Sequence, residues 1–173
     1  MRPSTASHPP SPRRRLRAAA RLVAAALAVG ASVLAAAHGN VTPQAVDTTG
    51  LAPLGEAWRS DNPYAGNPAA VEIGASGFNQ NCARCHGLEA ISGGIAPDLR
   101  RLDNDCASLK DKPRRDACVK DNDDYMITTV RHGRSRNGAV YMPPFEGVLS
   151  QEAMWAIKSY LESRREKPLP DAP

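Results

Sequence analysis

The longest apolar stretch of the chain lies near its beginning. Residues 22–37 read LVAAALAVGASVLAAA, and residues 2–21 before them contain six arginines and no acidic residue. A basic segment, a short apolar segment and an A-x-A ending are typical of a secretory signal peptide, so cleavage is predicted after Ala37. An uncleaved membrane anchor is the alternative, but this mostly alanine stretch falls short of the roughly 20 strongly apolar residues that a spanning helix needs.

The first helical pattern beyond this segment begins near Asn67 and Pro68. Asn is a favourable N-cap, and Pro is favoured in the first turn. Small or apolar side chains then recur with a helical period up to the first cysteine motif, at Ala70, Ile73, Gly74, Gly77 and Phe78. Because glycine inside a helix costs stability, the two glycines on this face predict that another helix crosses very closely there.

Two more helices are expected nearer the C-terminus. The acidic run 121–124 suits a helix start, where acids offset the helix dipole, and this helix would end at Gly133. Ser150 is the predicted cap of the last helix, which runs to about Arg165. Its apolar side chains fall in two adjacent rows, which are Ala153, Ala156 and Tyr160 on one side and Met154, Ile157 and Leu161 on the next.

The remaining segments carry loop signals. Residues 38–66 are rich in Pro, Gly, Thr and Asn and predict an extended arm over the domain, anchored by Trp58 and Tyr64, while residues 87–105 and 134–144 read as loops. No stretch alternates as a strand, so the predicted fold is all-α with three to four helices. The predicted organisation is a signal peptide at 1–37, the arm at 38–66, one helical domain at 67–165 and a C-terminal tail at 166–173.

Composition and charge change this picture in two ways. The chain has 22 basic and 18 acidic residues, and removal of the signal peptide leaves 16 basic residues against the same 18 acids. The basic pI therefore belongs to the precursor, and it does not indicate nucleic-acid binding. In addition, two Phe, two Trp and four Tyr give a thin core for so few helices. A large flat cofactor buried in the middle would supply the missing apolar surface.

Such a cofactor has an attachment motif in the sequence. Cys82 and Cys85 enclose two residues, and His86 follows directly. The C-x-x-C-H spacing lets two thiols on one helical turn form thioethers with the two haem vinyl groups, while the histidine ligates the iron. A thioredoxin-type pair would need a preceding strand, and a zinc site would need two more ligands at close spacing. The motif therefore predicts one covalent haem c.

An iron that transfers electrons and binds no substrate needs a second axial ligand. Met142 is the preferred candidate because two prolines follow it in Y-M-P-P-F, and proline restricts the residue before it. Met126 and Met154 lie at apolar helical positions, where methionine usually fills a core. The histidine candidates are His132, which closes a helix, and His38. An open sixth position is the remaining alternative.

Three further residues are candidates for supporting roles. A ligating histidine normally donates its other ring N–H to a fixed acceptor, and the Pro97 carbonyl in I-A-P-D-L could serve for His86. A plain turn role for Pro97 is the alternative. Arg134 and Arg136 are candidates for pairing with haem propionates, or they lie exposed.

Taken together, these motifs resemble class I cytochrome c. The resemblance rests on C-x-x-C-H after a first helix, A-P-D-L, a central helix ending in Gly-Arg, M-P-P-F and a closing amphipathic helix, over roughly residues 68–164. It implies that helices surround one covalent haem and that the first helix crosses the last, with Gly74 and Phe78 against Tyr160 and Leu161. It also implies Pro97 as the acceptor for His86, and Met142 as the distal ligand.

A closer resemblance is to the soluble periplasmic cytochrome that accepts electrons from ethanol dehydrogenases dependent on pyrroloquinoline quinone (PQQ). It rests on H-G-N-V-T-P-Q-A-V-D-T-T-G-L from His38, on P-L-G-E-A-W-R at 53–59, and on an extra cysteine pair. This resemblance implies a periplasmic electron carrier, with a PQQ-dependent alcohol dehydrogenase as donor and a terminal oxidase or another cytochrome as acceptor. It implies no enzyme activity, no nucleic-acid partner and no stable membrane insertion after cleavage. The alternatives are a haem subunit of a larger complex and a peroxidase-like or ligand-binding cytochrome with a labile distal site.

The second cysteine pair is Cys106 and Cys118. Thiols in an oxidising compartment tend to be paired, and a disulfide here would stabilise the fold by about 3 kcal/mol in the loop-entropy model. The enclosed loop carries a basic cluster that is either a docking patch for a dehydrogenase or a solvated loop, made of Lys110, Lys112, Arg114 and Arg115. The acidic run 121–124 could bind calcium, but it lacks the features of an EF-hand loop, so helix capping is preferred.

Overall fold

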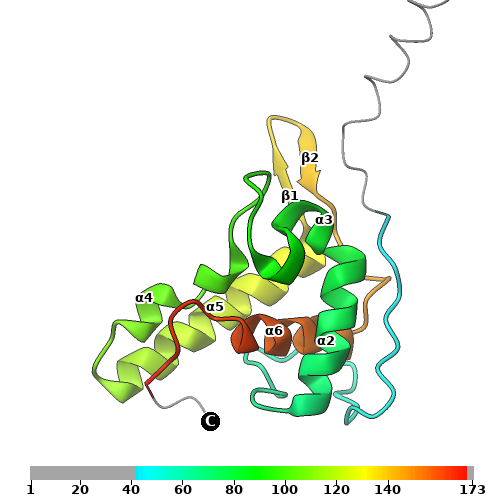
Figure 1. Ribbon diagram of the computed structural model, residues 1–173. Coiled ribbons are helices and arrows are strands. Elements are labelled where there is room, and N and C mark those ends of the chain that lie inside the picture. The colour runs from blue at the N-terminus through cyan, green and yellow to red at the C-terminus, as the bar shows by residue number, and fades with distance from the viewer. Residues whose placement is uncertain (1–41, 171–173) are drawn as a thin grey trace, which may run out of the picture. The chain divides into compact units, whose positions relative to one another are not determined.

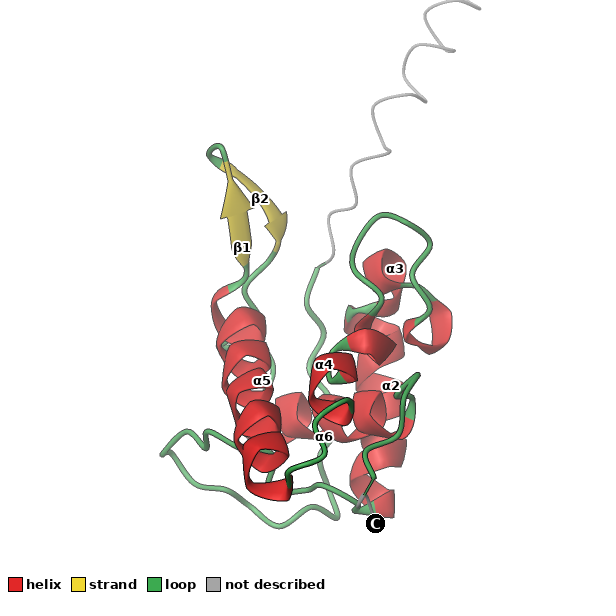
Figure 2. Cartoon of the chain, turned by 90° about the vertical axis from the view of Figure 1, so that its left-hand side faces the viewer, coloured by secondary structure: helices red, strands yellow, loops and turns green. Residues whose placement is uncertain are grey.

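The computed structural model describes residues 42–170. The predicted signal peptide, His38 and the last three residues lie outside the described part. In chain order the elements are α2 (Pro68–Asn81), α3 (Ala83–His86), η2 (Leu88–Ala90), η3 (Leu99–Arg101), α4 (Asn104–Ala107), α5 (Lys112–His132), β1 (Arg134–Arg136), β2 (Ala139–Met142) and α6 (Gln151–Ser163) (Figure 1). The predicted helical fold is confirmed, with one small hairpin in addition (Figure 2). Among the described helices, none is long and apolar enough to cross a membrane.

The contact between α2 and α6 is the centre of the fold. The Asn67 side chain caps α2 by accepting from the backbone N–H groups of Ala69 and Ala70. A Cβ at Gly74 would overlap the carbonyl oxygen of Ala156 in α6. The rings of Phe78 and Tyr160 lie 5.3 Å apart. The predicted close helix crossing is therefore confirmed, although Gly74 meets Ala156 rather than Tyr160 or Leu161.

The last helix is buried on nearly all sides. Ser150 caps it as predicted, and every residue from 153 to 161 is buried. The arm lies against the start of α6, because the backbone N–H of Leu54 donates to Glu152 at 2.8 Å and that of Arg59 donates to Gln151 at 2.7 Å. The arm thus satisfies polar groups at the start of α6.

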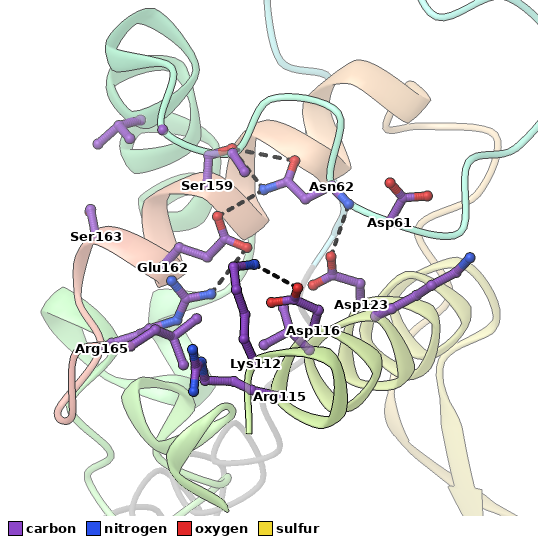
Figure 3. Close-up of a pocket in the computed structure, with 16 residues that line it drawn as sticks. Asp61, Asn62, Lys112, Arg115, Asp116, Asp123, Ser159, Glu162, Ser163 and Arg165 are labelled. Atoms are coloured by element: carbon purple, nitrogen blue, oxygen red, sulfur yellow. Dashed lines mark hydrogen bonds and ion pairs between the residues drawn. The ribbon is translucent and has the colours of Figure 1, made fainter. Parts of the chain in front are cut away.

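A buried ion cluster joins α6 to α5 and to the arm. Lys158 Nζ lies 2.6 Å from Asp123 Oδ1, 2.8 Å from Glu162 Oε1 and 3.5 Å from Asp103 Oδ2, and Arg165 Nε lies 2.7 Å from the same Asp103 oxygen. The arm reaches this cluster through Asn62 (Figure 3). The Asn62 side chain donates to Ser159 Oγ and Glu162 Oε2, and its backbone N–H donates to Asp123 Oδ2.

The predicted start of α5 is wrong. The helix begins at Lys112, where the Asp111 side chain accepts from the Arg114 N–H at 3.1 Å and Pro113 occupies the first turn. The acidic run 121–124 lies inside the helix and caps nothing. Its Asp123 instead pairs with Lys158. A disulfide joins Cys106 to Cys118 and thereby connects α4 to α5. Part of the segment between the two cysteines, which was predicted to be a loop, is helical.

Two predicted loops contain regular structure. In segment 134–144, β1 pairs antiparallel with β2, and Arg134 lies opposite Met142. Asn137 and Gly138 both have positive φ, at 52° and 78°, which is the conformation that two-residue hairpin turns require. Segment 87–105 contains η2, η3 and the start of α4. The hairpin places Met142 at the end of a strand.

Candidate functional site

The cysteine motif occupies one helical turn after α2. The Cys82 N–H donates to Phe78 O at 2.7 Å and ends α2, and the N–H groups of Cys85 and His86 donate to Cys82 O at 3.1 and 3.0 Å. The two thiols and the imidazole therefore leave the same turn. Burial, and to a lesser extent Cys85, raises the pKa of the Cys82 thiol to about 12. Reactive thioredoxin-type cysteines have a lowered pKa, whereas the pKa of Cys82 is shifted in the opposite direction.

The imidazole of His86 is held by the segment that follows it. Its Nδ1 lies 2.9 Å from the Pro97 carbonyl oxygen. When Nδ1 carries the proton and donates to Pro97, Nε2 is left as the free metal-binding nitrogen. Gly87 has φ 81°, and a Cβ there would overlap the carbonyl oxygen of Ile91, so the chain can turn back towards Pro97 only at a glycine. Asp98 caps η3 by accepting from the Arg100 N–H at 3.1 Å, which fixes the neighbouring peptide.

Met142 belongs to a second segment that α5 holds. It is half-buried and packs against the hydrophobic core. A Cβ at Gly133, whose φ is 68°, would overlap the Met142 carbonyl oxygen, so the loop passes directly over this glycine. After the two prolines, the Phe145 N–H donates to Val130 O at 3.0 Å and the Glu146 N–H donates to Arg131 O at 3.2 Å. The terminal carbonyls of α5 thereby anchor the segment.

The other candidates have different surroundings. Arg134 donates to Thr129 Oγ1 at 2.7 Å and lies 4.9 Å from the Tyr125 ring centroid. Arg136 is exposed on the hairpin. Met126 and Met154 are buried among core side chains, and His132 is exposed with its Nε2 3.4 Å from Glu146 Oε2.

The residues present fit a covalently held haem. Two half-buried thiols outside any disulfide share a turn with an imidazole whose Nδ1 has an acceptor. Residues 42–170 contain no group of three or more His, Cys, Asp or Glu side chains that could hold a bare metal ion. A porphyrin would supply four ligands of its own, so the protein would need to provide one or two more. The acidic run 121–124 does not form such a group of ligands either, so a calcium site there gains no support.

The segments around the motif expose apolar side chains. Segment 87–97 and the hairpin lie at the same end of the described part in both views (Figures 1 and 2). They carry five large apolar residues in exposed positions, namely Leu88, Ile91, Ile95, Val140 and Tyr141. We call these five residues the apolar rim. A pocket also exists between the arm, α5 and the end of α6 (Figure 3), but none of its lining residues comes from segments 82–97 or 131–146.

Sequence reasoning missed several residues that shape this site. The Asn137-Gly138 dipeptide is a strong hairpin signal and could have revealed the hairpin. Gly133 was recognised as a helix end but not as the residue beneath the Met142 segment. No local signal reveals the contact of Arg131 with Trp58 in the arm, whose ring centroid lies 4.0 Å from the guanidinium carbon.

A family profile and several known proteins are similar to this chain. A family profile described as "Cytochrome C oxidase, cbb3-type, subunit III" matches residues 69–161. A protein called cytochrome c550 from Pseudomonas aeruginosa is 55% identical over 136 residues, which are 76% of this chain and 84% of that protein. No solved structure shows a significant match.

Two enzymes from Pseudomonas putida are similar over a small part of their length. Quinohemoprotein alcohol dehydrogenase ADH-IIG is 50% identical over 34 residues, or 20% of this chain and 5% of the enzyme. Quinohemoprotein alcohol dehydrogenase ADH IIB is 30% identical over 106 residues, or 61% of this chain and 13% of the enzyme.

Proposed function

The chain belongs to the class I c-type cytochromes, and from this membership we propose that it is a periplasmic carrier between a PQQ-dependent alcohol dehydrogenase and a terminal oxidase or another cytochrome. It is an electron-transfer protein with covalently bound haem c. When bound, the haem iron supplies one-electron chemistry by alternating between its ferrous and ferric states. The observation that carries the proposal is the single turn that holds both thiols and an imidazole with its Nδ1 2.9 Å from Pro97 O.

Each site residue then has a defined task. Cys82 and Cys85 would hold the haem covalently, each by addition of its thiol S–H across one vinyl group, with the sulfur on one vinyl carbon, the hydrogen on the other and no leaving group. His86 would bind the iron through Nε2 while Nδ1 donates to the Pro97 carbonyl, which would fix the imidazole plane. Met142 would supply its sulfur as the second protein ligand of the iron.

The Met142 segment favours an iron whose sixth position is occupied by the methionine sulfur. Pro143 and Pro144 remove backbone donors and stiffen the chain, and the bonds from Phe145 and Glu146 to α5 hold the other end. A sulfur that is held in place keeps oxygen, peroxide and other small ligands from the sixth position. A closed site of this kind suits electron transfer between proteins rather than substrate turnover.

The apolar rim suits a short-lived complex with a partner. Exposed apolar patches on soluble proteins commonly mark interaction sites, and transient electron-transfer complexes use small interfaces. The side chains of Leu88, Ile95, Val140 and Tyr141 are all more than half exposed in the polypeptide alone, and a bound haem would cover part of this area. They flank the segments that would hold the haem, so a partner docked there would approach the cofactor.

The names of the relatives support a quinoprotein donor. The two dehydrogenases are called quinohemoproteins, so they contain haem as well as a quinone, and this chain resembles only a small fraction of each. This is the pattern expected if a haem-carrying segment of those enzymes does within one chain what this cytochrome does as a separate molecule. Export through the predicted signal peptide, with cleavage after Ala37, would bring the carrier to the periplasm.

Rapid mixing tests this proposal directly. Ferric holoprotein is mixed with a PQQ-dependent alcohol dehydrogenase and alcohol, and reduction of the haem is followed by absorbance. We expect alcohol-dependent reduction, with a second-order rate that falls at least several-fold in Val140→Asp while the reduction potential stays unchanged. The exposed substitution Thr128→Asp on α5 serves as the control with the same added charge. Reduction no faster than with an unrelated cytochrome of similar potential would contradict the proposed donor.

A further inference from the structure

The arm contacts the Met142 segment through one chain of side chains. Trp58 in the arm lies against Arg131 of α5, with the guanidinium carbon 4.0 Å from the ring centroid. Arg131 Nη2 lies 2.8 Å from Glu146 Oε1. Glu146 follows directly on the M-P-P-F sequence. We call Trp58, Arg131 and Glu146 the arm contact.

Trp58 is held in place on both sides along the chain. The Arg59 N–H donates to Gln151 Oε1 at 2.7 Å, and Gln151 Nε2 donates to Ala57 O at 3.2 Å and to Gly55 O at 3.3 Å. Gln151 is buried at the start of α6. The indole ring therefore presents a fixed surface to Arg131, because its neighbours are tied to the core.

Arg131 holds Glu146 at two points. Its carbonyl oxygen accepts from the Glu146 N–H at 3.2 Å, and its guanidinium group pairs with the Glu146 carboxylate. The Arg131 side chain is 22% exposed, so water screens this pair less than a fully solvated one. The two prolines between Glu146 and Met142 limit the backbone freedom of the segment. A change in the position of Glu146 therefore reaches Met142 through a stiff connection.

From this geometry we infer that the N-terminal arm positions the sixth iron ligand. Trp58 acts through Arg131 and Glu146, which hold the Met142 segment so that its sulfur stays at the iron. The inference rests on the proposed role of Met142 as iron ligand. Trp58 touches neither the iron nor the haem in this account, and it is a positioning residue. Removal of the indole frees the guanidinium group, loosens Glu146 and lets the Met142 sulfur leave the iron more often.

Competition for the sixth position measures this effect. Ferric holoprotein is titrated with imidazole, which binds the iron when the sulfur leaves, so its apparent affinity reports the open fraction. Loss of a cation–π contact of this kind corresponds to about a three- to tenfold change in an equilibrium constant, which here is the apparent affinity for imidazole. We expect Trp58→Leu to bind imidazole tighter by that factor. Trp58→Phe keeps an aromatic face and should stay close to the wild type, and Tyr64→Phe removes the hydroxyl bond to Ala52 within the arm and should not change the affinity.

A second variant approaches the arm contact from its other end. Glu146→Gln should tighten imidazole binding to a similar extent, and the double variant Trp58→Leu with Glu146→Gln should show less than the product of the two single effects, because both act on one contact. Unchanged affinity in both single variants would overturn the inference, as would an equal change in Tyr64→Phe. A wild-type protein that already binds imidazole as tightly as Met142→Ala would overturn the proposed ligand first, and the inference with it.

Discussion

At the scale of single residues, the site depends on side chains whose backbone is fixed by neighbours. His86 owes its orientation to the Pro97 carbonyl 2.9 Å away, and Gly87 allows the turn that brings that carbonyl back. Met142 owes its position to Gly133 and to the bonds that Val130 and Arg131 accept. The sequence predicted the ligand candidates themselves, since a motif and two prolines are local features. It did not predict what lies beneath Met142, because that contact joins the end of α5 to a segment on the far side of the hairpin.

Loss of the proposed sixth ligand should open the iron. In Met142→Ala the ferrous protein should bind carbon monoxide at once, whereas the wild type should not, and the reduction potential should fall because Met/His ligation raises it. Difference spectra after addition of carbon monoxide provide the measurement. Met126→Leu, a substitution of a buried methionine on α5, is the matched control and should remain inert. Immediate carbon monoxide binding by the wild type would instead favour a ligand-binding cytochrome.

The buried Asp103 should make stability depend on acid pH. Burial alone would raise its pKa, but Lys158 and Arg165 outweigh that effect and lower it below the usual value. Since the folded pKa lies below the unfolded one, the charged form stabilises the fold above about pH 4, and this contribution is lost as the pH falls through the folded pKa. Asp103→Asn should therefore be less stable than the wild type at pH 7, with a difference that narrows towards pH 3.

Denaturant unfolding of the holoprotein across this pH range measures the effect. The exposed neighbour Asp105 provides the control. The unfolding free energy of Asp105→Asn should stay within about 0.5 kcal/mol of the wild type, as is usual for surface changes. A difference between Asp103→Asn and the wild type that stays constant from pH 3 to pH 7 would contradict the assignment.

At the scale of elements, the sequence predicted helices where apolar spacing and caps agree. Helix α2 (Pro68–Asn81) follows its cap Asn67, and helix α6 (Gln151–Ser163) follows its cap Ser150. Both carry regular apolar rows, and both form. The first half of α5 was missed because it is highly charged, although Asp111 and Pro113 are good start signals. Lys158 was also missed, since a lysine between apolar rows reads as a surface residue. Its burial depends on carboxylates that come from three separate parts of the chain.

The crossing of α2 and α6 should not tolerate a methyl group. Gly74→Ala places a Cβ against the backbone carbonyl of Ala156, which cannot move without shifting α6. The loss in unfolding free energy should be roughly 1–3 kcal/mol, as for other overpacked cores, despite the better helix propensity of alanine. Gly93→Ala is the control, since a Cβ there meets nothing within 4 Å. Equal stability of the two variants in thermal unfolding would show that the helices do not approach this closely.

At the scale of the whole described part, the arm and the disulfide hold segments that are distant in sequence. The arm bonds to α2 through Gln44 and Asn81, to the start of α6 through Gln151, and to the ion cluster through Asn62. The course of such an arm could not be predicted from sequence, because it follows polar contacts with no period. The disulfide fixes α4 to α5 away from the cysteine motif. Loss of the disulfide should therefore lower the unfolding free energy without changing the reduction potential of the haem.

Removal of the disulfide tests this separation. The double variant Cys106→Ser with Cys118→Ser should lose about 3 kcal/mol of unfolding free energy, because the unfolded chain regains the freedom of the closed loop. Its visible spectrum and reduction potential should match those of the wild type. A change in potential that accompanies the loss of stability would show that the disulfide shapes the haem site as well.

The central claim is that one haem is joined covalently to the chain through Cys82 and Cys85. The intact mass of the protein purified under denaturing conditions tests it most directly. We predict the mass of the polypeptide that begins at His38 plus that of one haem, and no haem on a Cys82→Ser, Cys85→Ser double variant. A native polypeptide without added porphyrin mass would contradict the account.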